Sequence, residues 1–205
     1  MKARYFTYGE KEMDYLRQKD KKLSKVIDRI GLIEREVTPD LFVALVNSVI
    51  GQQISSKAAD TVCARLLGKC PLSAASLSQL SVEDIQSCGM SMRKASYIKN
   101  IAEAALTKTV DFDALPCKTD QEIIQALTTI KGVGVWTAEM LLIFSLMRPN
   151  VVSYGDLAIR RGMMQLYGLP DLSRAQFLKY AKRYSPYGSV ASLYLWAMSD
   201  PRFQL

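Results

Sequence analysis

A chain of 205 residues can form one large folded unit or two halves that share a core, and its 49% hydrophobic and 23% charged residues are typical of a soluble protein. The formal net charge of +7 favours a polyanionic partner such as nucleic acid, because each neutralised phosphate releases condensed counterions. The absence of histidine excludes serine–histidine and cysteine–histidine nucleophiles and histidine-containing zinc sites. Acid–base chemistry is therefore left to carboxylates, lysine, tyrosine or cysteine.

Cysteine usage and hydropathy describe the setting of the protein. The four cysteines match no CxxC zinc pair, so we expect buried, reduced thiols at Cys63, Cys70, Cys88 and Cys117. No apolar stretch is long and uniform enough to span a bilayer, and the first residues become charged too early for a secretory signal. We therefore expect no membrane partner and a cytoplasmic protein, associated with the nucleoid if its source is bacterial.

Nearly every segment has the composition of a helix, and helix-start signals recur along the chain. Thr38 before Pro39 predicts a cap followed by a proline in the first turn. Ser91 predicts the cap of the helix that follows it. Capping boxes are predicted at three further places: Ser81 with Asp84, Thr119 with Glu122, and Ser173 with Gln176.

Three segments are apolar on every side and predict buried helices, at residues 41–50, 138–147 and 190–198. No alternating pattern bounded by hairpin turns predicts a strand. We therefore predict an all-α fold with roughly ten helices of ordinary length joined by short loops. The strongest late break is the loop at residues 148–150, which separates a buried helix from the segment that holds Asp156.

The most informative stretch is LTTIKGVGVWTA, at residues 127–138. A helix ends at Ile130, and Gly132 and Gly134 then allow a backbone turn that other residues resist before the next helix begins. A glycine turn that enters a helix N-terminus exposes backbone N–H groups and a positive dipole end, which suit one phosphate, and Lys131 beside it adds a second contact. From spacing alone, a simple αα-hairpin with glycines for tight packing explains the stretch equally well.

Asp156 follows Gly155 and precedes the helical sequence Leu-Ala-Ile. From its position alone it is predicted to be the N-cap of a helix. As a cap, its carboxylate would accept hydrogen bonds from backbone N–H groups, which hold it oriented and ionised. This role is compatible with a catalytic one.

The glycine hairpin resembles the helix-hairpin-helix motif of DNA repair proteins, whose hairpin reads Leu/Ile-x-Gly-Val-Gly-x-x-Thr-Ala. Three further blocks occur in the expected order: VIGQQISSKA at 49–58, GMSMRKASYI at 89–98 and YSPYGSVA at 184–191. Together the four blocks resemble the 3-methyladenine DNA glycosylase II family of the helix-hairpin-helix DNA glycosylase superfamily. The resemblance covers nearly the whole chain.

This resemblance implies a single DNA glycosylase unit over residues 1–205, built from two helical subdomains with a cleft between them. The central helical subdomain is expected at about 38–147. The second subdomain is expected from the N-terminal segment together with 148–205. We also expect a monomer.

The resemblance further implies a base-excision enzyme that flips alkylated purines, of the 3-methyladenine and 7-methylguanine type, out of damaged double-stranded DNA and hydrolyses their N-glycosidic bond. Asp156 is then the catalytic carboxylate, which opposes positive charge on the sugar. Gln53, in the turn at residues 51–54, is the wedge that fills the gap left by the base. DNA contacts are expected from the hairpin: Lys131, Gly132, Val133, Gly134 and Thr137.

Trp136 and Tyr187 match base-pocket positions of the family, where aromatic faces would hold a cationic purine by cation–π stacking. Each of the two rings is equally compatible with a core aromatic. Met140 stands where some relatives carry an aromatic, which puts the selectivity of the pocket in doubt. Further pocket candidates lie near the N-terminus: Tyr5, Phe6 and Tyr8.

The position of Trp136 carries a second implication. Bifunctional relatives have a Schiff-base lysine there, so we expect a monofunctional enzyme that leaves an intact abasic site. No cysteine follows Cys117, so the C-terminal four-cysteine iron–sulfur motif of the endonuclease III branch is absent from the sequence, and we expect no cofactor and no metal among the site residues. A monovalent cation on the hairpin carbonyls remains open.

Other functions also remain open at this stage. One is a glycosylase for another damaged base, such as an oxidised or deaminated purine. A second is a non-catalytic helix-hairpin-helix protein that binds DNA architecturally. A third is a helical scaffold whose glycine hairpin serves only packing.

Overall fold

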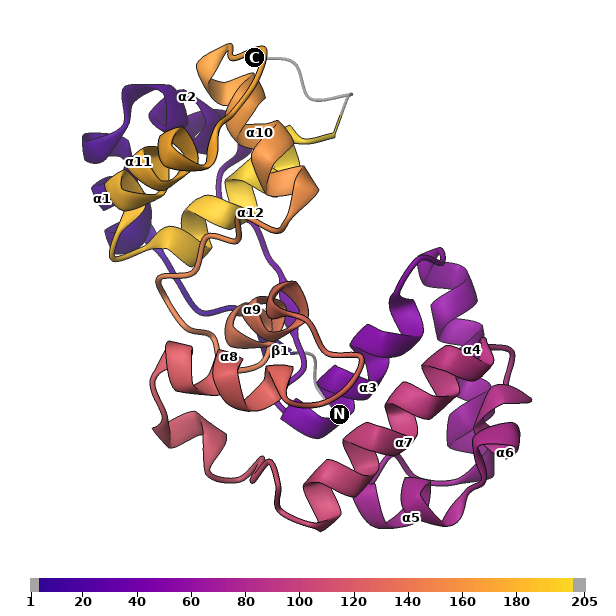
Figure 1. Ribbon diagram of the computed structural model, residues 1–205. Helices are drawn as coiled ribbons and strands as arrows, with labels where there is room; N and C mark the ends of the chain where they lie inside the picture. Colours follow the sequence, from indigo (N-terminus) through magenta and orange to yellow (C-terminus); the bar gives the residue numbers. More distant parts are fainter. Residues whose placement is uncertain (1–3, 201–205) are drawn as a thin grey trace. The chain divides into compact units, whose positions relative to one another are not determined.

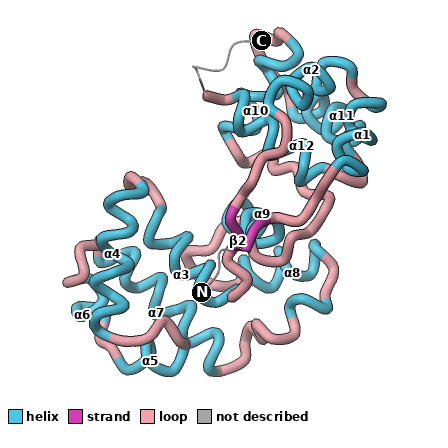
Figure 2. The backbone as a smooth tube through the Cα atoms, turned by 180° about the vertical axis from the view of Figure 1, so that it is seen from behind, coloured by secondary structure: helices cyan, strands magenta, loops and turns pink. Residues whose placement is uncertain are grey.

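The computed structural model describes residues 4–200, which are mostly helical (Figures 1 and 2). Its contacts divide the chain into two compact units, one over residues 38–141 and the other formed by the chain up to Val37 and from Leu142 onward. The division falls inside a helix, whereas the family resemblance implied a boundary at about residue 147. Within the described part, no helix has both the length and the apolarity needed to cross a bilayer.

The unit over residues 38–141 is organised around one long helix. Its elements are α3 (Leu41–Gly51), α4 (Ser56–Lys69), α5 (Ala74–Gln79), α6 (Val82–Gln86), α7 (Met92–Leu106), the 3-10 helix η1 (Leu115–Cys117), α8 (Asp120–Thr128) and the first part of α9 (Val135–Phe144). Helix α7 packs against α3, α5 and α6, and it buries one face that includes Ile98 and Ile101. It is therefore the central helix of this unit.

The other unit is organised around the last described helix. Its further elements are β1 (Arg4–Tyr5), α1 (Glu10–Lys19), α2 (Lys21–Ile30), β2 (Glu36–Val37), α10 (Leu157–Tyr167), α11 (Arg174–Tyr184) and α12 (Gly188–Met198). Helix α12 packs against α10, α11, α1 and α2, which surround it (Figure 1). Strands β1 and β2 pair antiparallel, a feature that the sequence did not predict because two residues are too short to show an alternating period.

Most predicted helix starts are confirmed. All three capping boxes form, and Ser91 accepts a hydrogen bond from the backbone N–H of Lys94 as the N-cap of α7. The prediction of Thr38 as a cap was wrong. Helix α3 begins at Leu41 and is capped by Asp40, whose Oδ1 accepts from the backbone N–H of Val43 at 2.9 Å. Asp40 is at least as strong a cap as Thr38 and directly precedes the apolar segment.

The predicted buried helix at 138–147 is displaced toward the N-terminus. Helix α9 ends at Phe144, and its first residues, Val135 and Trp136, are exposed. The chain leaves the helix through a left-handed turn at Met147, and the N–H of Arg148 donates to the carbonyl of Leu142 at 2.8 Å. Apolarity on all sides therefore located this helix but not its ends.

Helices α10 and α12 approach so closely that one position between them has no room for a side chain. A Cβ on Gly162 of α10 would lie 2.0 Å from the backbone carbonyl oxygen of Leu195 in α12. Backbone atoms cannot retreat as a flexible side chain can, so any larger residue must push the helices apart. The packing of this unit thus depends on a glycine at this position.

We predict that Gly162→Ala lowers the free energy of unfolding by about 3 kcal/mol or more, because the added methyl group overlaps α12 backbone. Gly68→Ala is the matched control, since Gly68 lies in α4 with open space around its Cα, and it should stabilise by about 0.5–1 kcal/mol. Urea denaturation followed by circular dichroism measures both. Equal stability of the two variants would contradict the close helix contact.

Candidate functional site

The turn between α8 and α9 contains one glycine that the structure requires. Gly132 has φ of 101°, and a Cβ there would lie 2.2 Å from Cγ of Tyr97 in α7. The N–H of Val133 closes the turn by donating to the carbonyl of Ile130 at 3.0 Å. A Cβ on Gly134, in contrast, would meet nothing within 4 Å. The hairpin backbone therefore rests on the Tyr97 ring, while the space at Gly134 is left open.

This open space lies at the N-terminus of α9. The first hydrogen bond of the helix runs from the N–H of Ala138 to the carbonyl of Gly134 at 3.1 Å, so the amides before Ala138 lie in the first turn, where the helix supplies no carbonyl. Gly134 has no side chain with which to cap them. The result is a positive helix end suited to an anion. Val133 and Thr137 are both buried, so the side chains of these two predicted contact residues are not available to DNA in this conformation.

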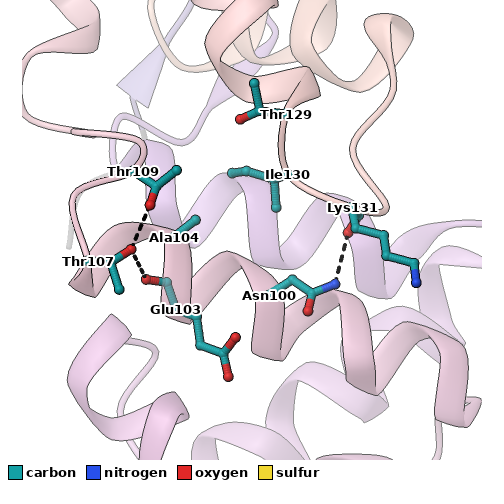
Figure 3. A pocket seen from close by; sticks show the side chains of 8 residues that line it. All are labelled: Asn100, Glu103, Ala104, Thr107, Thr109, Thr129, Ile130 and Lys131. Atoms are coloured by element: carbon teal, nitrogen blue, oxygen red, sulfur yellow. Dashed lines mark hydrogen bonds between the residues drawn. The ribbon is translucent and has the colours of Figure 1, made fainter.

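Lys131 adds charge beside the hairpin. Its backbone carbonyl accepts a hydrogen bond from Nδ2 of Asn100 in α7 at 3.4 Å, and its side chain is exposed, with the ammonium end pointing away from Glu103 (Figure 3). A pocket of about 390 Å³ lies here, and it is lined by Arg93, Ser96, Tyr97, Asn100 and Lys131. Two cations and no carboxylate line it, which suits a phosphate.

The neighbouring pocket has a different character. It measures about 300 Å³, shares Asn100 and Lys131 with the first, and is completed by Glu103 and several threonines (Figure 3). The carboxylate of Glu103 makes this pocket less favourable for an anion. The charges around Asn100 therefore favour a phosphate on the Arg93 side of the hairpin.

The predicted wedge and one predicted base-pocket residue lie together. Gln53 is exposed and has φ of 59°, in the left-handed region that residues other than glycine seldom adopt. A pocket of about 290 Å³ is lined by Ser48, Gly51, Gln52, Gln53 and Trp136. Trp136 is 41% exposed, so the interpretation of this ring as a core aromatic was wrong. Met140 lies one turn further along α9 and is half-buried.

Asp156 is confirmed as the N-cap of α10. Its Oδ1 accepts a hydrogen bond from the backbone N–H of Ile159 at 2.9 Å, and its own N–H donates to the carbonyl of Ser153 at 3.4 Å. The residue is only 6% exposed. A carboxylate so enclosed and bonded is fixed in one orientation, which is what a group that must face a developing charge requires.

Tyr187 lies at the start of α12, in the same unit as Asp156. Its ring is half-buried and packs edge to face on Tyr15, with ring centroids 5.2 Å apart. The hydroxyl of Tyr15 donates to the carbonyl of Ser185 at 2.7 Å, which ties α1 to the segment before Tyr187. Tyr187 is therefore held by packing while part of its ring remains accessible.

The three N-terminal pocket candidates differ in their surroundings. Phe6 is buried and packs against Tyr8, whose hydroxyl donates to the carbonyl of Ile33 at 3.0 Å and accepts from its N–H at 2.7 Å. These two residues thus tie the N-terminal segment to the chain before β2. Tyr5 is exposed on β1.

The cysteines are free thiols, as predicted, but only Cys88 is buried, and Cys117 is exposed. Burial raises the pKa of the Cys63 and Cys70 thiols, which disfavours their reactive thiolate forms. Among residues 4–200, no group of three or more cysteine, aspartate or glutamate side chains is placed to hold a metal ion.

Four residues of α7 that face the hairpin or the turn at 51–54 were not among the sites predicted from the sequence. These are Arg93, Lys94, Tyr97 and Asn100. Spacings of three and four residues place them on neighbouring positions of one helix. Three of the four fall in the block at 89–98, but nothing in the sequence identified their partners.

Comparison with known proteins places these features in a family context. The family model "HhH-GPD superfamily base excision DNA repair protein" matches residues 46–186. The chain is 36% identical to DNA-3-methyladenine glycosylase 1 of Schizosaccharomyces pombe over 162 residues, which cover 76% of this chain and 71% of that protein.

Two solved structures are similar along most of their length. A crystal structure of DNA-3-methyladenine glycosidase from Bacillus halodurans matches with a TM-score of 0.83 and 33% identity, covering 98% of this chain and 94% of that one. The Schizosaccharomyces pombe 3-methyladenine DNA glycosylase in complex with abasic DNA matches with a TM-score of 0.80 and 31% identity, covering 91% and 95%.

We predict that substitutions at the two hairpin glycines have different effects, one on stability and the other on DNA binding. Gly132→Ala should destabilise the protein by about 1–3 kcal/mol, because the residue has positive φ and its Cβ overlaps the Tyr97 ring. Gly134→Ala should leave the melting temperature nearly unchanged and weaken binding to duplex DNA, because its methyl group occupies the open space at the N-terminus of α9. Thermal melting and fluorescence anisotropy measure the two effects. Unchanged DNA affinity of Gly134→Ala would argue against phosphate binding there.

Proposed function

We propose that this protein is a monofunctional DNA glycosylase for alkylated purines. The chain belongs to the HhH-GPD superfamily of base excision DNA repair proteins. The names of the similar proteins support 3-methyladenine as a substrate. The proposal includes 7-methylguanine because it is also a cationic alkylated purine. The observation that carries the proposal is the buried carboxylate of Asp156, fixed by a backbone amide at a helix N-terminus.

Binding begins at the DNA backbone. The N-terminus of α9 receives one phosphate, and Lys131 neutralises charge beside it. A base within the duplex hides its glycosidic carbon, so the nucleotide must leave the stack at a cost of a few kcal/mol. Gln53 enters the gap and offsets part of that cost by restoring contacts to the neighbouring bases.

The chemical step requires little more than a negative charge. As the glycosidic bond breaks, the sugar approaches an oxocarbenium ion, and the carboxylate of Asp156 opposes its positive charge and orients or deprotonates the attacking water. An alkylated purine carries a positive charge and leaves as a neutral base. Its departure therefore needs no separate general acid, which agrees with a chain that contains no histidine.

Recognition of the lesion follows from the same charge. The exposed ring of Trp136 offers a face on which a cationic purine stacks more strongly than a neutral one. Tyr187 adds a second, partly accessible ring in its own unit. Met140 supplies a polarisable but non-aromatic surface, so selectivity for cationic bases depends mainly on the two rings.

The proposed enzyme needs no cofactor and acts as a monomer in the compartment that holds the DNA. The hairpin offers only neutral backbone carbonyl oxygens as cation ligands, and the carbonyls of Ile130 and Lys131 each already accept one hydrogen bond. Such oxygens suit a hard monovalent cation rather than a thiophilic metal. A cation bound there would add a positive charge for the phosphate.

We predict that Asp156→Asn lowers the single-turnover rate of base release by at least about 10²–10³-fold, because the opposing charge is lost while an N-cap remains. Mass spectrometry of bases released from methylated duplex DNA measures the rate and identifies the lesions. The same assay on a duplex that contains 8-oxoguanine tests the oxidised-purine alternative.

Asp40→Asn is the matched control, because Asp40 also caps a helix through Oδ1 and a backbone amide at 2.9 Å. It should release bases at the wild-type rate. Base release that persists unchanged in Asp156→Asn would refute the catalytic assignment. If the wild type binds duplex DNA without releasing bases, the result would favour a non-catalytic protein that binds DNA architecturally. If it does not bind duplex DNA at all, the result would favour a helical scaffold whose glycine hairpin serves only packing.

We also predict that the product strand stays intact. Trp136 has no amine to form a Schiff base, so incubation with lesion DNA should give an abasic site that breaks only after alkali or heat. Denaturing gel electrophoresis with and without alkali distinguishes an intact strand with an abasic site from a strand that the enzyme has cut. Borohydride trapping of a covalent protein–DNA adduct would contradict a monofunctional mechanism.

A further inference from the structure

The turn at residues 51–54, which we call the wedge turn, is held in an unusual backbone state. Helix α3 ends at Gly51, and Gln53 follows with φ of 59°. Within the turn, the N–H of Ile54 reaches the carbonyl of Gly51 only at 3.5 Å. The local hydrogen bonding of the wedge turn is therefore weak, although its conformation is one that a glutamine seldom adopts.

A lysine from another helix supplies the missing contacts. Nζ of Lys94, in α7, donates to the carbonyl of Ile50 at 2.8 Å and to the carbonyl of Gln52. These carbonyls lie at the C-terminal end of α3, where the helix leaves its last carbonyls without partners and its dipole favours a cation. Lys94 thus clamps the chain immediately before Gln53. Partial burial of the ammonium lowers the pKa of Lys94.

The same helix holds the phosphate-binding hairpin. Tyr97, three residues after Lys94, lies beneath Gly132, and Asn100, three residues further, donates to the carbonyl of Lys131 at 3.4 Å. One side of α7 therefore contacts both the wedge turn and the hairpin. A rigid helix between two such elements fixes the distance between them.

We propose that Lys94 is a positioning residue for base flipping, which holds the wedge turn in register with the phosphate-binding hairpin so that Gln53 is already placed to enter the duplex. This inference rests on the proposed function, since it concerns the step before bond cleavage. Preorganisation of this kind lowers the entropic cost of inserting the wedge. Loss of Lys94 should slow base excision from duplex DNA without weakening the binding of the hairpin to phosphate.

A second lysine of α7 provides a matched control. Nζ of Lys99 donates to the carbonyls of Ser78 and Leu80, at 2.5 and 2.7 Å, at the C-terminal end of α5. Lys99 thus makes the same pair of contacts to a helix end that carries no proposed site residue. Lys94→Met and Lys99→Met each remove one ammonium group from α7. Only the Lys94→Met substitution removes contacts to the wedge turn.

The test is a double-mutant cycle on Lys94 and Gln53, measured as single-turnover release of 7-methylguanine from duplex DNA at saturating enzyme, where the rate does not depend on the fraction of inactive protein. Lys94→Met should lower the rate by about tenfold in the native background and by less than about twofold in a Gln53→Ala background, because both changes then remove one function. Lys99→Met should release the base within about twofold of the wild-type rate. Affinity for undamaged duplex should stay within about twofold in all variants.

Several outcomes would overturn the inference. They are an undiminished effect of Lys94→Met in the Gln53→Ala background, an equal loss in Lys99→Met, or no loss in Lys94→Met. If Lys94→Met does not fold, the same double-mutant cycle is measured with Lys94→Gln. Its side-chain amide retains a hydrogen-bond donor but no charge, and its effect is again compared between the native and Gln53→Ala backgrounds. A wild-type protein that releases no base would instead refute the proposed function itself, so the two failures are distinguishable.

Discussion

The contact between the hairpin backbone and the Tyr97 ring is the constraint on which the proposed phosphate-binding site depends. Because Gly132 has no Cβ and adopts positive φ, the chain lies directly on the ring, and open space is left at Gly134, where the next helix begins. The contact also fixes the hairpin to α7, the helix around which the unit of residues 38–141 is built. The surface proposed to bind DNA is thereby tied to a core helix.

Helix α7 joins its neighbours by charge as well as by packing. Lys94 and Lys99 each place an ammonium group on the carbonyls at the end of a helix, α3 and α5 respectively. These two positive charges belong to the architecture of the fold. The net charge of +7 is therefore an imperfect measure of how strongly the protein attracts DNA, since part of the basic content stabilises helix ends.

The proposed chemistry is correspondingly sparse. A substrate that already carries positive charge needs opposition to the cationic sugar more than proton transfer to the leaving base, and one oriented carboxylate can supply it. The structural role of Asp156 as a helix cap and its proposed catalytic role use the same hydrogen bond from Ile159. Stability and catalysis thus select the same residue, which is why position alone could not separate the two interpretations.

Features that are decided within one helical turn could be predicted from the sequence. The mostly helical fold, the capping boxes, the cap at Asp156 and the glycine hairpin all follow from residues no more than a few positions apart. The resemblance to a family added the candidate roles of Gln53 and Trp136. What the sequence left undecided depends on partners distant along the chain: Lys94 reaches carbonyls more than forty positions before it, and Tyr97 meets a glycine far beyond it.

The exposure of Trp136 and the early end of α9 were likewise decided only by the tertiary structure. Composition and spacing determine which residues can form a helix, a cap or a turn. Burial and contact depend on which surfaces meet, and those are set by the packing of the whole unit.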